Sequence, residues 1–148
     1  MHKSQPSLYI SHTHWEQMRA DVDQRYPEEA CGFVAGKDRI TRKVIPVTNA
    51  LHSPVRFRME AREQLDGMLE IDRRDWELTA IYHSHPQGPP HPSPTDLAEA
   101  AFPEAINLIW FKKDSHWDCR GFIIHNKEFW EIPLQVEDKP IVDENDPG

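Results

Sequence analysis

The sequence predicts one α/β domain, in which a mixed, mainly antiparallel sheet is flanked by helices. Short apolar runs typical of strands alternate with segments of helical periodicity. The chain has 148 residues, which is enough to bury one sizeable core without a disulfide. No period of about 20–50 residues repeats, so solenoids and propellers are excluded.

The first predicted elements are a short strand over residues 8–10 and a helix beginning at Thr13. Thr13 and Glu16 are spaced as a capping box. The apolar residues that recur at helical spacing are Trp15, Met18, Val22 and Tyr26. Pro27 then ends the helix, because proline has no amide N–H and its ring clashes with the preceding turn.

The next segment predicts further strands and a second helix. Residues 33–36 and 44–47 flank a turn at Lys37, which is typical of an antiparallel pair, and residues 55–59 alternate like a third strand. The second helix is expected over residues 61–75. Its shared apolar face is expected to carry Leu65, Met68, Leu69 and Trp76.

The second half of the chain predicts a strand, a short helix and three closing strands. The first strand covers residues 78–82, and a proline-rich loop leads from it to a helix that starts near Ser93. The closing strands are expected at 106–111, 116–125 and 128–134, with a hairpin at Asn126. We therefore expect a domain over residues 1–135 and an acidic, disordered tail over residues 136–148.

Composition and charge exclude several classes of protein. Lys and Arg number 17 against 25 Asp and Glu, a net charge of −8, which disfavours binding to nucleic acid. No run approaches the about 20 apolar residues of a membrane span, and the first residues lack the apolar region of a secretion signal. Cys31 and Cys119 form no paired pattern, as expected in a reducing compartment. The sequence thus predicts a soluble, cytoplasmic protein.

The most informative residues are two histidines at the end of the strand over 78–82. Side chains alternate along a strand, so His83 and His85 project from the same face and can bind one ion. Asp96 could add an oxygen ligand if the proline-rich loop brings the next helix back to the strand end. Two nitrogens and one carboxylate leave a fourth position of a tetrahedral Zn²⁺ for water, the arrangement of catalytic zinc sites.

Two simpler interpretations stay open at this point. Ser93 and Asp96 also suit a helix start, as N-cap and first-turn acid, although capping and metal binding are compatible. Hydrolysis needs a base that is not itself a ligand, and either Glu28 or Glu29 is a candidate. Local sequence does not choose between these two glutamates, and each could be a solvated charge.

These residues resemble the JAMM/MPN zinc metallopeptidases, which are recognised by an upstream glutamate and the pattern His-Ser-His-Pro-(x6)-Ser-x2-Asp. Residues 83–96 match that pattern completely. Residues 27–32 resemble the Pro-x-Glu-x-Cys-Gly pattern of the family, which selects Glu29. Residues 45–50 look like the compact bacterial branch that includes peptidases of ubiquitin-like sulfur-carrier proteins.

The resemblance implies a fold, a set of roles and a substrate class. The fold is the MPN (cytidine-deaminase-like) fold, with Zn²⁺ bound by His83, His85 and Asp96. Glu29 would be the general base and Ser93 the donor to the oxyanion. The substrate would be a ubiquitin-like or sulfur-carrier protein ending in Gly-Gly, cut after its last glycine. Its tail would pair with residues 55–59, so the expected substrate-binding residues are Val55, Phe57 and Met59.

Two other functions remain open on the sequence. The protein could be a zinc hydrolase of free peptides or small amides, because the metal motif does not define what enters the cleft. It could also be an MPN scaffold that binds proteins without catalysis. The complete set of ligands in residues 83–96 disfavours the scaffold.

Overall fold

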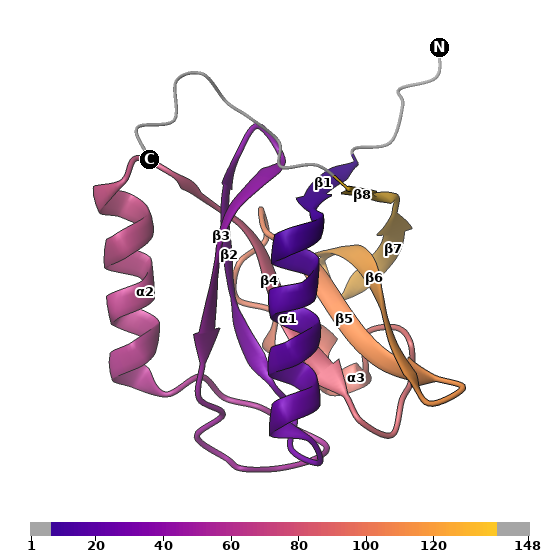
Figure 1. Ribbon diagram of the computed structural model, residues 1–148. Helices are drawn as coiled ribbons and strands as arrows, with labels where there is room; N and C mark the ends of the chain where they lie inside the picture. Colours follow the sequence, from indigo (N-terminus) through magenta and orange to yellow (C-terminus); the bar gives the residue numbers. More distant parts are fainter. Residues whose placement is uncertain (1–6, 139–148) are drawn as a thin grey trace.

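A computed structural model describes residues 7–138, which form an eight-stranded mixed sheet with helices on both faces (Figure 1). The strand order is β7-β6-β5-β4-β2-β3-β1-β8, and antiparallel pairings outnumber parallel ones by four to three. The predicted fold class is confirmed. The elements are β1 (Leu8–Ser11), α1 (His12–Arg25), β2 (Cys31–Lys37), β3 (Ile40–Val47), α2 (Ala61–Arg73), β4 (Glu77–His85), α3 (Pro94–Glu99), β5 (Ile106–Lys113), β6 (His116–His125), β7 (Glu128–Ile132) and β8 (Leu134–Glu137).

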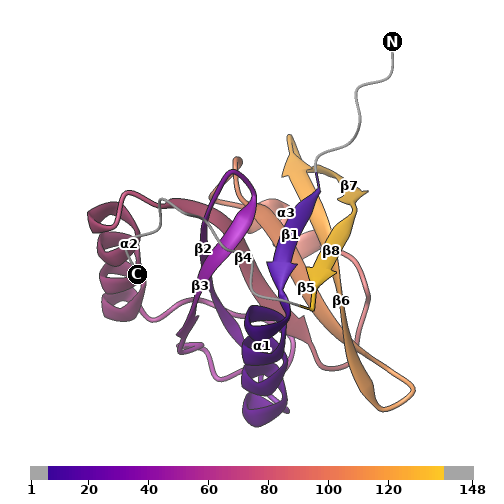
Figure 2. The same cartoon turned by 45° about the horizontal axis from the view of Figure 1, so that its top comes forward.

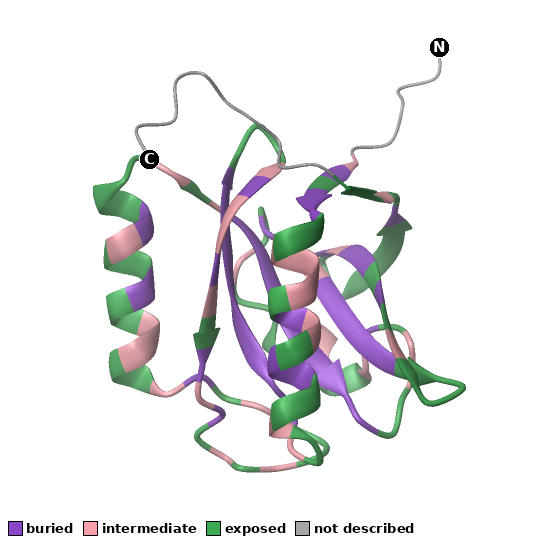
Figure 3. Cartoon of the chain, viewed as in Figure 1, coloured by how far each residue is buried: buried purple, intermediate pink, exposed green. Residues whose placement is uncertain are grey.

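The sheet separates two apolar cores. On one face, Met18 and Val22 of α1 pack against Val34 and Tyr82. On the other face, Ile71 of α2 packs in a cluster with Phe33, Ile81 and Cys31 of β2 and β4. Consecutive residues of one strand thus enter opposite cores, as the two-residue period of a strand requires. Figure 3 shows burial concentrated on these central strands.

Helix α1 begins two residues earlier than its predicted capping box. Ser11 is the N-cap, and its side chain accepts a hydrogen bond from the backbone N–H of His14 at 3.2 Å. The prediction of Thr13 as N-cap was wrong, because Ser11 at the end of β1 already satisfies the first turn. The helix ends at Arg25, before Pro27, as expected.

The apolar face predicted for α2 is wrong for three of its four residues. Leu65, Met68 and Leu69 are exposed, whereas Gly67 and Ile71 are buried against the sheet. The fourth, Trp76, packs against the same core just after the helix, as expected. Gly67 explains the rotation of the helix, because a Cβ atom at this position would lie 3.0 Å from the Phe33 ring. A glycine in the contact lets the two elements approach closely, and that contact outweighs the periodicity of the larger apolar residues.

The segment over residues 55–59 is not a strand. It forms a loop whose one β-bridge, antiparallel between Asn49 and Met59, lies outside the strands of the sheet. Met59 and Phe57 pack against the core on the α2 face instead of pairing in the sheet. Alternation alone was a misleading signal, because a strand also needs a neighbour for its amide groups.

The last predicted strand is divided in two by Pro133, which cannot donate a ladder hydrogen bond. β7 pairs with β6, and β8 lies beside β1 at the opposite edge of the sheet (Figure 2). Val136 and Glu137, expected in the acidic tail, therefore belong to β8, and residues 139–148 of that tail lie outside the described residues. No helix within residues 7–138 is long and apolar enough to cross a membrane.

Candidate metal centre and active site

The two histidines of the motif lie at the carboxyl end of β4, as the sequence predicts. His83 and His85 are 2% and 4% exposed and lie on the α2 face of the sheet, two residues beyond Ile81. Ser84, between them, points to the opposite face and accepts a hydrogen bond from the N–H of Ala30 at 2.7 Å. The strand thus places both imidazoles on one side and uses the intervening serine to join β4 to the segment that precedes β2.

Asp96 reaches the histidines from the first turn of α3. Ser93 caps this helix, and its Oγ accepts from the N–H of Asp96 at 3.1 Å. In return, Oδ2 of Asp96 accepts from the N–H of Ser93 at 2.9 Å. This capping box orients the same carboxylate oxygen that faces the two imidazoles, so capping and convergence of the three groups occur together.

The three donor atoms are arranged as a metal-binding group. Nε2 of His83 lies 3.1 Å from Nε2 of His85 and 3.2 Å from Oδ2 of Asp96, and the His85–Asp96 distance is 3.0 Å. A tetrahedral ion with ligands at about 2.0–2.1 Å holds its ligand atoms about 3.3 Å apart. Atoms already 3.0–3.2 Å from one another therefore fit a single small divalent ion.

Neighbouring contacts orient the two imidazoles. Nδ1 of His85 lies 2.7 Å from the carbonyl oxygen of Pro89, which favours the tautomer with Nδ1–H as donor and Nε2 free as a ligand. The ring of Phe57 stacks on His83 with centroids 4.7 Å apart and planes at 28°. These two contacts restrict rotation of both rings, so the ligand nitrogens face the same point.

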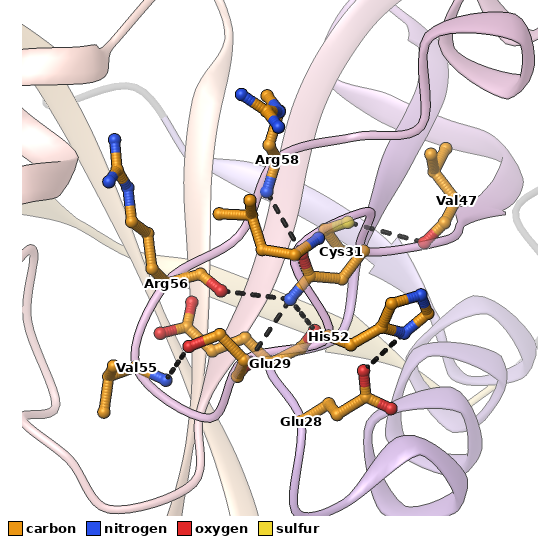
Figure 4. Close-up of polar contacts among 11 residues, drawn as sticks. Glu28, Glu29, Cys31, Val47, His52, Val55, Arg56 and Arg58 are labelled. Carbon is orange, nitrogen blue, oxygen red and sulfur yellow. Dashed lines mark hydrogen bonds and ion pairs between the residues drawn. The ribbon is translucent and has the colours of Figure 1, made fainter.

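Glu29 lies beside these ligands. It is 3% exposed, and ligand atoms of Glu29, His83 and His85 all lie within 4.8 Å of one another. Within residues 7–138, its Oε1 has no hydrogen-bond partner. Glu28 instead points outward and pairs with His52 at 2.8 Å (Figure 4). The structure therefore places Glu29 and not Glu28 at the site, as the family resemblance indicates.

The electrostatic environment assigns opposite properties to the two carboxyl groups. The pKa of Glu29 is raised from 4.5 to about 8, mainly because the carboxyl is buried. The charge of His85 lowers this pKa, and the charge of Asp96 raises it. Burial also disfavours the charge of Asp96, but hydrogen bonds from His83 and His85 hold its pKa far below the usual value. Asp96 is thus ionised as a metal ligand must be, whereas Glu29 can exchange a proton near neutral pH.

The two histidines differ in the same way. Burial lowers the pKa of His83, which favours its neutral, metal-binding form. For His85, burial is outweighed by the hydrogen bonds to Asp96 and Pro89, and the pKa is raised. The nearby Cys31 thiol is buried and its pKa is raised to about 12, so it is a core residue and not a nucleophile.

A cavity of about 380 Å³ opens beside the ligands, between the loop over residues 51–59 and α3. His83 and Asp96 line one end of it. All three residues expected to bind substrate, Val55, Phe57 and Met59, also line this cavity, although Val55 is exposed and Met59 is mostly buried.

Two features of the site were not predicted from the sequence. An ion pair between Arg56 and Glu99 joins the two walls of the cavity. The buried side chain of Asn49 bonds to the backbone of Glu29 and to the loop over residues 51–59. Arg56 and Glu99 have no role in the sequence analysis. Asn49 appears there only within residues 45–50, which look like the compact bacterial branch, and nothing in the sequence signals its contact with Glu29.

The comparison with protein families agrees with this geometry. The model of prokaryotic homologs of the JAB domain matches residues 11–127. The chain belongs to the prokaryotic JAB/MPN family. Among the relatives of this JAB protein, a probable TtuB-protein conjugate cleaving protease from Thermus thermophilus is 37% identical, with 87% of this chain and 82% of the relative covered. The CysO-cysteine peptidase of Mycobacterium tuberculosis is 34% identical, with 80% and 84% covered.

Solved structures support the same assignment of the JAB domain. A solution structure of a protein from Desulfitobacterium hafniense superposes with a TM-score of 0.80 at 29% identity, covering 89% of this chain and 94% of that one. A JAB1/MPN domain protein from Archaeoglobus fulgidus, at 18% identity, shares the fold with a TM-score of 0.56, covering 88% and 98%. The family, the fold and the peptidases among the relatives make this JAB protein a hydrolase of the JAMM type.

Proposed function

We propose that this JAB protein is a zinc-dependent peptidase or isopeptidase that cuts the amide bond after the C-terminal glycine of a ubiquitin-like or sulfur-carrier protein. One observation carries the proposal: three ligand atoms of His83, His85 and Asp96 lie 3.0–3.2 Å apart, beside the carboxyl of Glu29, whose Oε1 has no hydrogen-bond partner within residues 7–138. This combination supplies a metal site and a separate base, which are the two requirements of metal-assisted hydrolysis.

His83, His85 and Asp96 would hold the ion, and Zn²⁺ suits two nitrogens and one carboxylate. When bound, zinc polarises the scissile carbonyl and lowers the pKa of water to about 7. A divalent ion bound beside Glu29 would favour the ionised, proton-accepting form of this carboxyl.

Glu29 and Ser93 have separate roles in bond cleavage. Glu29 accepts a proton from the attacking water and delivers it to the leaving amine, while the oxygen of the water joins the carbonyl carbon and the C–N bond breaks. The Oγ of Ser93 accepts a hydrogen bond from Asp96, and its hydroxyl proton remains available to the oxyanion. Removal of one such donor typically costs about 10²–10³ in turnover.

The loop over residues 51–59 is suited to bind an extended tail. The backbone groups of Arg56 and Arg58 already bond to Asn49 and Ala50. Phe57 lies between Arg56 and Arg58, and we infer that its backbone groups pair with the substrate tail. A Gly-Gly end fits this place, because residues without side chains approach a metal centre closely.

The names of two relatives support a protein conjugate or adduct as substrate, since one is named for TtuB-protein conjugates and the other for CysO-cysteine. The alternative, hydrolysis of free peptides, is tested against it directly. Zinc-loaded protein is incubated with carrier proteins linked through Gly-Gly to lysine or cysteine, and separately with short Gly-Gly-X peptides. Cleavage of the carrier adducts at a much higher kcat/KM supports the proposal, and efficient turnover of the peptides alone overturns it.

Two variants separate the roles within the site. Glu29→Gln is expected to keep zinc and lose turnover. Ser93→Ala is expected to keep zinc and lose about 10²–10³ in kcat. Full activity of Glu29→Gln would rule out the assigned base, and His83→Ala serves as the control that loses the metal.

A further inference from the structure

We propose that Asn49 is a positioning residue, which holds Glu29 in its catalytic place and joins this base to the loop over residues 51–59. The inference rests on the proposed function of Glu29 and adds the residue through which the cavity wall and the base are connected. Asn49 follows the end of β3 and is 3% exposed.

The amide nitrogen of Asn49 connects Glu29 to the loop. Nδ2 donates to the backbone carbonyl of Glu29 at 3.1 Å and to that of Arg56 at 3.0 Å. A third, longer contact of 3.4 Å reaches the carbonyl of Ser53. Figure 4 shows Glu29 and Arg56 close together at this point, although they are far apart in the chain.

The amide oxygen of Asn49 closes the loop on itself. Oδ1 accepts from the backbone N–H of Leu51 at 3.0 Å and of Arg58 at 3.2 Å. A primary amide has two N–H donors and two acceptor lone pairs, so the side chain uses its full capacity on backbone groups. Such complete satisfaction in a buried place fixes the side chain in one orientation.

Glu29 lies before the start of β2, so its backbone is positioned by Asn49 and the loop and not by the pairing of strands. Its N–H donates to the carbonyl of Ser53 at 2.8 Å, so both backbone groups of the base bond to the loop or to Asn49. Its carboxyl Oε1 has no partner among residues 7–138, so the backbone determines where the carboxyl lies. A displacement of about 1 Å in a catalytic group can cost about 10² in rate.

The test uses the nearly isosteric variant Asn49→Asp, which keeps the acceptors and loses the donors. With zinc-loaded enzyme and a carrier adduct, we expect kcat to fall about 30–100-fold, KM to change less than about threefold, and bound zinc to stay stoichiometric. The matched control is Asn126→Asp, the same substitution at an exposed residue in the turn between β6 and β7, outside the loop and the site. Its kcat is expected within about twofold of wild type.

Three outcomes overturn the inference. The first is a kcat of Asn49→Asp within about threefold of wild type. The second is an equal loss in Asn126→Asp, and the third is a loss explained by KM or by missing zinc. A second cycle adds Asn49→Asp to Glu29→Gln: no further loss of residual turnover supports action through Glu29, and the same fold loss on both backgrounds overturns it.

Wild-type protein provides a measurement that does not depend on a variant folding. The side-chain NH₂ protons of Asn49 are expected to exchange with solvent much more slowly than those of the exposed Asn126, and equal exchange overturns the inference. The failure of the proposed function is distinguishable. An active Glu29→Gln refutes the assigned base, whereas an inactive Glu29→Gln with a fully active Asn49→Asp refutes only the role of Asn49.

Discussion

Glu29 costs the metal-free protein stability at neutral pH, and Glu29→Gln is expected to restore it. The pKa of Glu29 is raised by burial from 4.5 to about 8. At pH 7.5 the unfolded chain has this carboxyl ionised, while the folded protein must keep it protonated. This pH lies about three units above the unfolded pKa, and each unit corresponds to about 1.36 kcal/mol. The loss in free energy of unfolding caused by Glu29 is therefore at most about 4 kcal/mol.

The sign of this effect is the reverse of that for a salt-bridged carboxylate. Because the folded pKa lies above the unfolded one, folding takes up a proton, and stability falls as the pH rises from about 4.5 to about 8. At pH 5 the cost is below about 1 kcal/mol. Glutamine has no charge to suppress, so we expect the gain of Glu29→Gln to grow by about 3 kcal/mol between pH 5 and pH 7.5.

The assay is urea denaturation of chelator-treated wild type and Glu29→Gln at both pH values, with the free energies of unfolding compared at each. Asp96 and the histidines are present in both proteins, so the comparison reports Glu29 together with its influence on His85, whose pKa its charge raises. Glu131→Gln is the matched control, because Glu131 is an exposed residue of β7. The reasoning is refuted if the difference between wild type and Glu29→Gln is the same at pH 5 and pH 7.5, or if Glu131→Gln gives the same result.

Three further predictions concern the metal, the cavity and the sheet. His85→Ala is expected to weaken zinc binding more than about 100-fold in a chelator competition, because it removes a ligand; unchanged affinity would contradict this. The ion pair between Arg56 and Glu99 joins the two walls of the cavity, and we expect a substrate tail to break it on entry. Glu99→Gln removes this pair, which is worth about 0–1 kcal/mol, so KM for a carrier adduct should fall by up to about fivefold; a rise in KM would contradict this. Gly32→Ala is expected to cost about 1–3 kcal/mol in urea denaturation, because its Cβ would lie 2.4 Å from the Tyr82 ring; a loss below about 0.5 kcal/mol would show that the ring moves freely.

The common face of the two histidines was predictable because it follows from local rules. His83 and His85 share a face by the two-residue period of a strand, and Ser93 begins a helix by its capping chemistry. The convergence of Asp96 was conditional in the sequence, because it needs the proline-rich loop to bring α3 back to the strand end, and the family resemblance supplied it. The shared face and the helix start depend on neighbouring residues, so for them the local sequence was sufficient.

The base was not predictable in this way, because its place depends on strands that are distant in the sequence. Cys31 pairs with His83 in the antiparallel register of β2 and β4, which brings Glu29 opposite His85. Local sequence contains no signal for that register, and Glu28 was an equal candidate until the family resemblance selected Glu29. Asn49 was missed for the same reason, since its partners lie on both sides of it in the chain.

The parts of the site therefore differ in how firmly they are held. His83 and His85 belong to a central strand with neighbours on both sides, and Asp96 is held by its own capping box. Glu29 lies outside the strands and depends on one buried amide and one loop. The two imidazoles thus belong to the sheet, while Glu29 belongs to a segment held by the wall of the cavity. Phe57 of the same wall stacks on the ring of His83, so we expect contact of a substrate tail with this wall to act on both Glu29 and His83.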